Sequence, residues 1–355
     1  MKILVITQAV DVHNTTLGFF TRWLEEFSER FELISVICLE EGEHALPKNV
    51  HVHSLGKEIW VEERSQISEV RKKIQYIFKF CKYIWKYRNE YDTVFVHMNQ
   101  EYIVLGGLFW KLLGKKIFFW RNHPYGNMWT RIAVCFSDRI FCTADRSFTA
   151  RYKKTTLMPA GVDTTVFTVG SEVKKDKGSL LVFGRIAPVK RVEKVIDITA
   201  SLLAEGVDVE LSVVGDALPR DHNYVEDLKK RSSLAHLEAH IHFVKGVDFL
   251  QAASTYQSHE VYLNFTESGS FDKTVIEALA CGTKVLVSNT SMKDILPEGS
   301  YTTGEISDSV EKLRTLLSLT PEEEITYHTK AQKVVEEQSL QTLMDQLKTY
   351  IYADK

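Results

Sequence analysis

The chain has 355 residues, of which 44% are hydrophobic and 26% are charged. That length exceeds what one hydrophobic core usually organises, so the sequence predicts two domains. The formal net charge of −3 argues against a protein whose main partner is nucleic acid.

The first eight residues read as a β-strand, because they lack the long apolar stretch and the small-residue cleavage site of a signal peptide. The longest apolar stretch, 102–113, is too short to cross a bilayer and contains Lys111. The five cysteines form no CxxC pair and stand among apolar residues. These features are typical of a reduced, cytoplasmic protein with buried thiols.

Short runs rich in β-branched residues alternate with helical patterns along the whole chain. In the first half, the predicted strands are 3–7, 33–38, 93–97, 116–120 and 139–143, and the predicted helices are 19–30, 67–88 and 102–113. In the second half, the strands are 179–183, 208–214, 241–244, 261–264 and 284–288, and the helices are 192–204, 224–232, 249–257 and 274–280. A last helical segment, 321–352, has a predicted break near Gln338 and Ser339.

This alternation predicts the α/β class, with parallel sheets covered by helices on both faces. The polar stretch 170–178 is the predicted linker, and the two domains are expected to join near residue 165. In such sheets ligands bind beyond the carboxyl ends of the strands. No GxGxxG follows a strand, which argues against a nicotinamide dehydrogenase.

A basic loop follows the predicted strand 179–183. Gly184 ends the strand, and Arg185 and Lys190 stand in the loop before the next helix. A guanidinium can hold two phosphate oxygens, and a helix N-terminus favours negative charge, so the loop can bind a diphosphate. The alternative is a solvated basic loop without a ligand.

A loop of small residues follows the strand 261–264 and leads into a helix that carries Glu277. Small residues let a ligand approach the backbone, whose amides can donate to phosphate or hydroxyl oxygens. Glu277 can accept hydrogen bonds from two ribose hydroxyls, as an acidic residue does in dinucleotide sites. The alternative is a surface glutamate stabilised by the helix dipole.

Four motifs in this order resemble those of the family 4 glycosyltransferases, and the resemblance covers nearly the whole chain. VFGR at 182–185 with Lys190 is similar to the family's donor-diphosphate motif, and EALACGTKV at 277–285 is similar to its EAMACGTPV signature. VVGD at 213–216 and PAGVD at 159–163 are similar to a strand end and to the domain junction of the family.

The resemblance implies the GT-B fold, with two facing Rossmann-like domains and a last helix that crosses back to the first. The implied boundaries are 1–164 for the acceptor-side domain, 165–338 for the donor domain and 339–355 for the returning helix. A retaining, hexosyltransferase-type reaction is also implied, in which a UDP- or GDP-linked sugar is the co-substrate. The leaving phosphate then helps to deprotonate the acceptor hydroxyl, and no metal or other cofactor is expected.

The resemblance also assigns roles to individual residues. Arg185 and Lys190, after Gly184, would bind the diphosphate, Glu277 the ribose, and the strand end at Val244 would flank the base. In the first domain, Gly18 is expected near the phosphate. His123 follows a predicted strand, as does the family histidine near the reacting sugar, although a lone histidine is more often structural.

The chain departs from the family at one position of the donor loop. The family has two glutamates separated by seven residues; the second is Glu277, and Gly269 stands where the first is expected. The loop is instead made of Gly269, Ser270, Phe271, Asp272 and Lys273, whose amides and polar side chains are predicted to contact the donor. Two alternatives stay open: a nucleotide-sugar epimerase, which needs no separate acceptor, and an inactive sugar-nucleotide-binding protein, which the missing first glutamate keeps open.

The segment 71–88 combines lysines and tyrosines with an apolar face of Ile74, Ile77, Phe78, Cys81, Ile84 and Trp85. Basic residues with interfacial aromatics are typical of helices that touch an anionic membrane, where a lipid-linked acceptor would be met. The protein would then work at the inner face of the membrane. The alternative is a domain helix that packs through its apolar face and leaves its charges in water.

Overall fold

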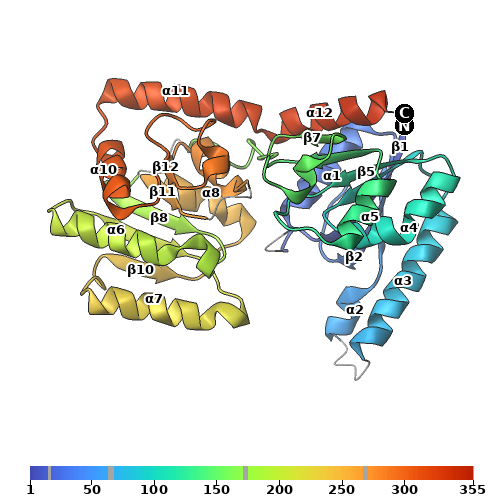
Figure 1. The fold of residues 1–355 in the computed structure, drawn as a ribbon, viewed down its shortest axis with the longest axis horizontal. Coiled ribbons are helices and arrows are strands. Elements are labelled where there is room, and N and C mark those ends of the chain that lie inside the picture. The colour runs from blue at the N-terminus through green and yellow to red at the C-terminus, as the bar shows by residue number, and fades with distance from the viewer. Residues whose placement is uncertain (15–16, 63–67, 171–174, 267–270, 355) are drawn as a thin grey trace. The chain divides into compact units, whose positions relative to one another are not determined.

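The computed structural model of the protein describes residues 1–14, 17–62, 68–170, 175–266 and 271–354. These residues form two compact units, each with its own parallel sheet (Figure 1). Unit 1 comprises Met1–Pro159 and Gln341–Lys355, and unit 2 comprises Ala160–Leu340. The predicted α/β class is therefore confirmed.

Unit 1 holds a seven-stranded sheet in the order β3-β2-β1-β4-β5-β6-β7, and every neighbouring pair is parallel. Helices cover such a sheet on both faces, which is why its central strands are nearly continuous apolar runs. All five residues of β4 are buried. The strands are β1 (Lys2–Val10), β2 (Leu33–Glu41), β3 (Val50–Ser54), β4 (Thr93–His97), β5 (Lys116–Trp120), β6 (Arg139–Cys142) and β7 (Thr155–Leu157).

The helices of unit 1 follow the strands in alternation. Asn127 begins α5 with a capping box, in which its side chain accepts from the Thr130 backbone and the Thr130 side chain accepts from the Asn127 backbone. The helices are α1 (Phe19–Arg30), α2 (Lys57–Glu62), α3 (Glu69–Lys86), α4 (Gln100–Leu112) and α5 (Met128–Phe136), with a 3-10 turn at Phe148–Arg151.

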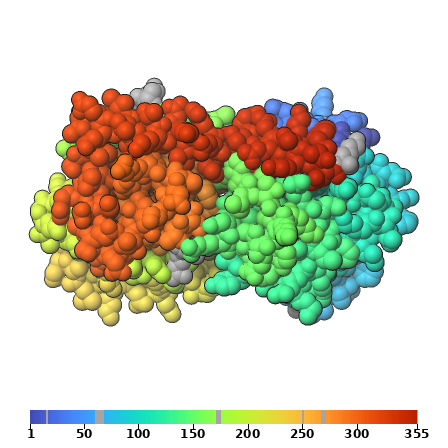
Figure 2. Space-filling view, turned by 45° about the horizontal axis from the view of Figure 1, so that its top comes forward, coloured from blue at the N-terminus to red at the C-terminus, as the bar shows by residue number. Residues whose placement is uncertain are grey.

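The last helix, α12 (Leu340–Ala353), packs on unit 1, as the resemblance implied. Arg30 of α1 donates to Asp345 at 2.9 Å, and Arg139 of β6 donates to Asp354 at 2.5 Å. In Figure 2 the red atoms of α12 lie against the green atoms of unit 1. The preceding helix, α11 (Pro321–Glu337), ends at the predicted break.

Unit 2 holds a five-stranded parallel sheet in the order β10-β9-β8-β11-β12. Its strands are β8 (Ser179–Phe183), β9 (Glu210–Val214), β10 (Ile241–Val244), β11 (Val261–Asn264) and β12 (Lys284–Val287). Its helices are α6 (Val192–Ala204), α7 (His222–Leu234), α8 (Phe249–Gln257), α9 (Lys273–Ala280), α10 (Ile306–Leu317) and α11. Short 3-10 turns lie at Pro188–Lys190, Pro219–Asp221 and Thr290–Met292.

The structure adds elements that the sequence pattern did not predict. Three of them are short: β3 and β7 have five and three residues, and α5 has nine. The helices α2 and α10 were also missed. The predicted linker 170–178 falls partly outside the described residues.

Two expectations about side-chain burial were wrong. Cys81 and Cys135 are exposed, whereas Cys38, Cys142 and Cys281 are buried as predicted. In α3 the core-facing residues are Phe80 and Ile84, and most of the predicted apolar face lies on the surface. Among the helices of the described ranges, none is long and apolar enough to span a membrane.

Candidate functional site

Three loops meet at the carboxyl edge of the unit 2 sheet, where β8, β9 and β11 end. Gly184, which follows β8, has a φ of +111° and donates its backbone N–H to the Val214 carbonyl at 3.0 Å. Gly215 passes so close that a Cβ on it would lie 1.9 Å from the Gly184 carbonyl oxygen. Glycine is therefore required at both strand ends, which brings the basic loop next to its neighbour.

Arg185 and Lys190, in the loop after β8, differ in exposure and in their partners. Arg185 is exposed, and it forms no hydrogen bond or ion pair with any residue that the structure describes. Lys190 is 22% exposed, and its Nζ lies 2.5 Å from Asp272 Oδ2. Of the two predicted diphosphate ligands, one is held in an internal ion pair and the other is available to a ligand.

Asp272 is the centre of a polar network at the start of α9. Its Oδ2 accepts hydrogen bonds from Lys190 Nζ, from Asn264 Nδ2 at 2.7 Å and from Thr266 Oγ1 at 2.9 Å. Its Oδ1 accepts from Thr274 Oγ1 at 2.6 Å. Although Asp272 occupies the N-cap of α9, its carboxylate makes no capping bond, because side chains occupy both oxygens.

The network keeps Asp272 ionised. Burial by itself would raise the pKa of this carboxyl, but the charge of Lys190 and the hydrogen bonds from Lys190, Thr274 and Asn264 lower it well below its usual range. Asn264 also donates to the Tyr262 hydroxyl at 3.0 Å, and that hydroxyl lies 2.8 Å from Thr274 Oγ1. The lysine is thus oriented by an anion that residues at the end of β11 and in α9 hold in place.

Glu277 lies one helical turn after Lys273 and is only 8% exposed, so the alternative of a surface glutamate is wrong. Burial raises the pKa of Glu277, which the charge of Lys273 partly opposes and that of Asp272 reinforces. The Tyr256 hydroxyl donates to Glu277 Oε2 at 3.3 Å. Burial also lowers the pKa of Lys273, and the negative charges of Glu277 and Asp163 partly oppose that shift.

The remaining predicted donor residues are placed unequally. Gly269 and Ser270 lie outside the described residues. Phe271 is half-buried and packs against the core of unit 2. Val244 is exposed at the end of β10, and its carbonyl accepts from the Gly215 N–H at 3.0 Å, so it stands beside the glycine pair.

In unit 1, Gly18 is buried immediately before α1. A Cβ on it would lie 2.8 Å from the carbonyl oxygens of both Val12 and Asn14, and its own N–H donates to Asn14 at 2.8 Å. The close packing of this backbone therefore accounts for the glycine. Its predicted role towards a phosphate stays a prediction.

His123 is exposed in the loop after β5. Its Nδ1 lies 2.9 Å from the carbonyl oxygen and 3.1 Å from the backbone nitrogen of Tyr125. Arg121, which is buried, donates through Nη2 to the same carbonyl at 2.9 Å, and burial lowers the pKa of its guanidinium despite Glu101. The loop is thus folded over its own side chains, and the His123 ring is presented at the surface.

Several members of the Asp272 network were not predicted, namely Asn264, Thr266, Thr274, Tyr262 and Tyr256. Asn264 and Thr266 did carry a signal, because polar residues at the carboxyl end of a buried parallel strand are candidates for ligand binding. The two tyrosines carried none, since each reads as an ordinary apolar core residue in its element.

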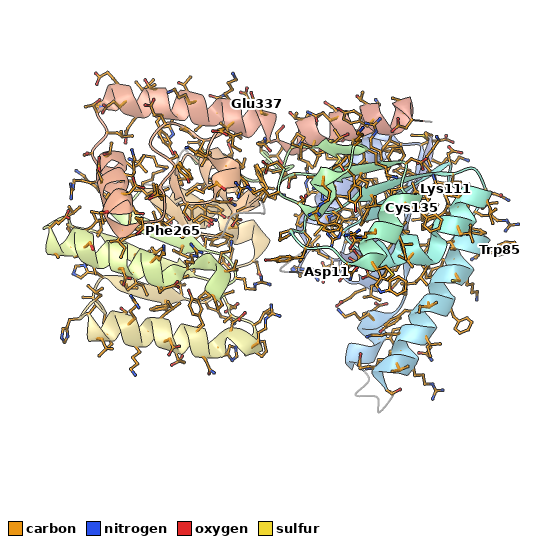
Figure 3. The ribbon with its side chains drawn as sticks, viewed as in Figure 1. Asp11, Trp85, Lys111, Cys135, Phe265 and Glu337 are labelled. Carbon is orange, nitrogen blue, oxygen red and sulfur yellow. The ribbon has the colours of Figure 1, made fainter. Side chains whose placement is uncertain are left out.

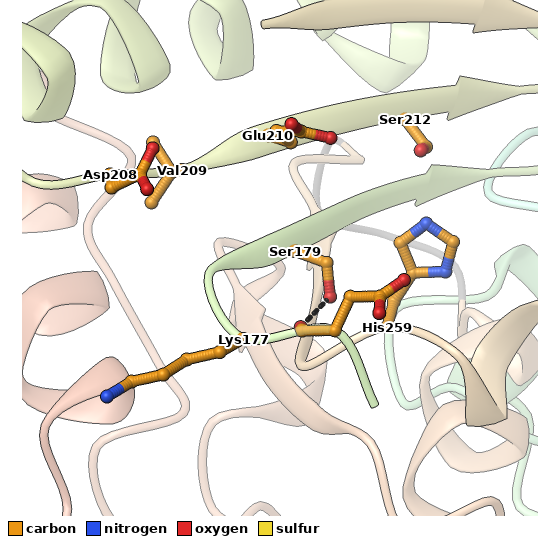
Figure 4. Close-up of a pocket in the computed structure, with 8 residues that line it drawn as sticks. Lys177, Ser179, Asp208, Val209, Glu210, Ser212 and His259 are labelled. Atoms are coloured by element: carbon orange, nitrogen blue, oxygen red, sulfur yellow. Dashed lines mark hydrogen bonds between the residues drawn. The ribbon is translucent and has the colours of Figure 1, made fainter. Parts of the chain in front are cut away.

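A polar hollow of about 270 Å³ lies at the opposite edge of the unit 2 sheet (Figure 4). It is lined by the starts of β8 and β9 and by His259, and the Ser179 hydroxyl donates to the Asp176 carbonyl at its margin. None of the predicted donor residues lines it. Ligands of open parallel sheets bind at the carboxyl edge, so this hollow is not the candidate site.

Residues 166–332 match the family model described as glycosyl transferases group 1. This segment falls within unit 2 and contains Arg185, Lys190, Asp272 and Glu277. A comparison with curated protein sequences found no match.

Solved structures match the whole chain at low sequence identity. HepE of Anabaena, crystallised with UDP, is 18% identical with a TM-score of 0.76, covering 99% of this chain and 100% of that one. Sucrose-phosphate synthase of Thermosynechococcus elongatus is 14% identical with a TM-score of 0.77, covering 100% of both chains. The lipopolysaccharide outer core galactosyltransferase WaaB is 15% identical with a TM-score of 0.69, again covering 100% of both.

These matches confirm the GT-B fold. Within unit 2, residues 166–332 match the family model of glycosyl transferases group 1.

Proposed function

We propose that the protein is a retaining glycosyltransferase that moves a sugar from a nucleotide-diphosphate sugar to an acceptor hydroxyl. The observation that carries the proposal is the cluster at the carboxyl edge of the unit 2 sheet. There an exposed arginine, Arg185, and an oriented lysine, Lys190, stand within the segment that matches glycosyl transferases group 1. The buried Glu277 belongs to the same segment.

The two cations are proposed to stabilise the charge that develops on the departing diphosphate. Lys190 has three N–H donors, of which Asp272 uses one, so the others can reach phosphate oxygens. Arg185 can hold two oxygens at once. Because these side chains supply the positive charge, the proposed reaction needs no metal ion.

Glu277 is proposed to accept hydrogen bonds from the ribose hydroxyls. A buried carboxylate has several acceptor sites, and the hydrogen bond from the Tyr256 hydroxyl occupies one of them, which leaves acceptor capacity for the ribose. The base is proposed to be uracil or guanine, and the HepE structures with UDP and with UDP-glucose favour uracil.

In the proposed step, the bond between the sugar C1 and the diphosphate oxygen breaks, and the acceptor oxygen bonds to C1 on the same face. The acceptor proton passes to the leaving phosphate. No side chain is required as a covalent nucleophile, so the protein acts by charge stabilisation and by positioning. His123 is proposed to contact the reacting sugar from unit 1.

The acceptor is proposed to be a glycan or a lipid-linked sugar at the inner face of a membrane. The similar fold of WaaB, a lipopolysaccharide outer core galactosyltransferase, supports an acceptor of this class. The basic aromatic helix α3 is the second support.

Donor binding and transfer test the proposal together. UDP, GDP, ADP and their sugars are compared by thermal shift, since a ligand that binds the folded state alone raises Tm. Arg185→Ala is expected to slow donor turnover by about 10²-fold or more without changing Tm, because the side chain is exposed. Lys177→Ala, which removes an exposed cation at the opposite sheet edge, is the matched control.

Wild-type turnover in Arg185→Ala, or no response to any nucleotide, would overturn the donor site. Interconversion of two nucleotide sugars without an acceptor would instead identify an epimerase. Binding without either transfer or donor hydrolysis would identify an inactive binding protein.

A further inference from the structure

The outward face of α3 is apolar. The helix contacts the core of unit 1 through Phe80 and Ile84, whereas Ile74 and Phe78 lie on another side of the helix and are exposed. Phe78 is 72% exposed and Trp85 is 60% exposed. A soluble domain normally turns such residues inwards, so this orientation calls for a partner.

The neighbouring helix extends the same surface. Leu105, Leu108 and Leu112 of α4 recur at spacings of three and four, and all three are exposed, Leu112 to 78%. Trp85 of α3 packs on Phe109 of α4 with ring centroids 5.7 Å apart, which joins the two stripes. Figure 3 labels Trp85 and Lys111 on the outer side of these helices. The α3–α4 face is defined by Ile74, Ile77, Phe78, Trp85, Leu108 and Leu112.

Positive charge borders this face. Although the chain has a net charge of −3, α3 carries six lysines and arginines against one acid, Glu69. Arg71 and Lys82 lie beside the apolar stripe on the helix surface, and neither forms an ion pair with a described residue. The guanidinium of Arg88 lies over the Trp85 ring at 4.6 Å. The helix therefore joins exposed aromatics to unpaired cations.

We propose that the α3–α4 face docks on an anionic phospholipid surface, with both helices lying in the headgroup region. Apolar side chains would enter the acyl boundary while the lysines and arginines meet lipid phosphates. A second copy of the chain fits less well, because two such faces would set their cations against each other. This inference rests on unit 1 alone and does not depend on the transferase reaction.

Flotation of the full chain with vesicles tests the proposal. The wild type is expected to float with vesicles that contain phosphatidylglycerol, to release at high salt, and not to float with phosphatidylcholine alone. Lys82→Glu and Leu112→Ser are each expected to weaken the partition on the order of tenfold. The matched controls are Lys230→Glu and Leu234→Ser, which change residues of similar exposure in unit 2 and should bind like the wild type.

Tm and donor hydrolysis in solution, measured for all four variants, separate docking from folding and from the proposed activity. Both are expected to stay at the wild-type level. The proposal is overturned if the wild type ignores anionic vesicles or if the α3 and α4 variants float like their controls. It is equally overturned if the wild type is a dimer that these variants convert to a monomer, since the face would then be a self-interface.

Discussion

The carboxyl edges of the two sheets hold their polar residues in different ways. In unit 2, Lys190 and Asp272 are 82 residues apart in sequence, and residues from β11 and α9 bind the same carboxylate. In unit 1, the His123 ring forms hydrogen bonds with Tyr125 of its own loop, and Gly18 packs against the backbone of Val12 and Asn14.

The site in unit 2 is therefore preorganised by contacts between residues far apart in sequence, whereas the residues in unit 1 are held by their sequence neighbours. Lys190 and Asp272 are paired before any ligand arrives, so Lys190 needs little reorganisation when a diphosphate binds. The same pairing makes them part of the stability of the unit. Rate and stability should therefore be coupled at Lys190 and separable at exposed side chains such as Arg185 and His123.

The largest effect is expected for Lys190→Ala. Removing the lysine leaves Asp272 ionised and 11% exposed without its counterion, which should lower the free energy of unfolding by about 2–3 kcal/mol. Donor turnover should fall by about 10²-fold or more. Denaturant unfolding and donor hydrolysis measure the two effects.

The control is the double variant of Lys190→Ala with Asp272→Asn. It is expected to recover part of the lost stability, since the unpaired charge is gone, but none of the lost rate. Equal stability of wild type and Lys190→Ala would show that the pair is not preorganised.

The next effect concerns unit 1. Gly18→Ala places a Cβ 2.8 Å from two backbone carbonyl oxygens, so the start of α1 must shift, at a cost of about 1–3 kcal/mol. Nucleotide binding by the folded variant also tests the predicted phosphate contact of Gly18. Weakened binding supports that contact, and wild-type binding would leave backbone packing as the reason for the glycine.

The sequence pattern predicted the central strands of both sheets, but it missed the edge strands β3 and β7 and the Asp272 network. Strands such as β4 and β11 are buried on both faces and read as apolar runs, so the α/β class followed directly. The Lys190–Asp272 pair depends on how the loops after β8 and β11 lie beside each other. No local pattern encodes that distance.

The orientation of α3 shows the same limit in another form. Its stripe of Ile74, Ile77 and Phe78 has the period of a core-facing helix, and so does the set that contains Phe80 and Ile84. Period alone does not tell which of two apolar faces meets the sheet. The packing of Phe80 against Tyr102 and Trp110 of α4 decides it.

A smaller effect is expected for His123→Ala, which should lower the rate of transfer but leave the stability nearly unchanged. The ring is exposed, so the free energy of unfolding should change by less than about 0.5 kcal/mol. Transfer should slow by roughly tenfold or more if the ring assists the reacting sugar. His51→Ala, an exposed histidine on β3, is the control, and equal rates in the two variants would remove His123 from the site.

The smallest effect tests the charge of Glu277 through pH. Because burial raises its pKa, the folded protein keeps this proton to higher pH than the unfolded chain does. The stability that protonation contributes is complete below the unfolded value of about 4.3 and is lost as pH rises through the folded value. Glu277→Gln cannot lose a proton, so its stability relative to the wild type should rise between pH 4 and 7, by about 0.5 kcal/mol or more. Denaturant unfolding at each pH measures that difference in stability. If the difference does not change with pH, burial does not raise the pKa of Glu277 in the folded protein. The proposed ribose role would then lose its basis, because it depends on a desolvated carboxylate.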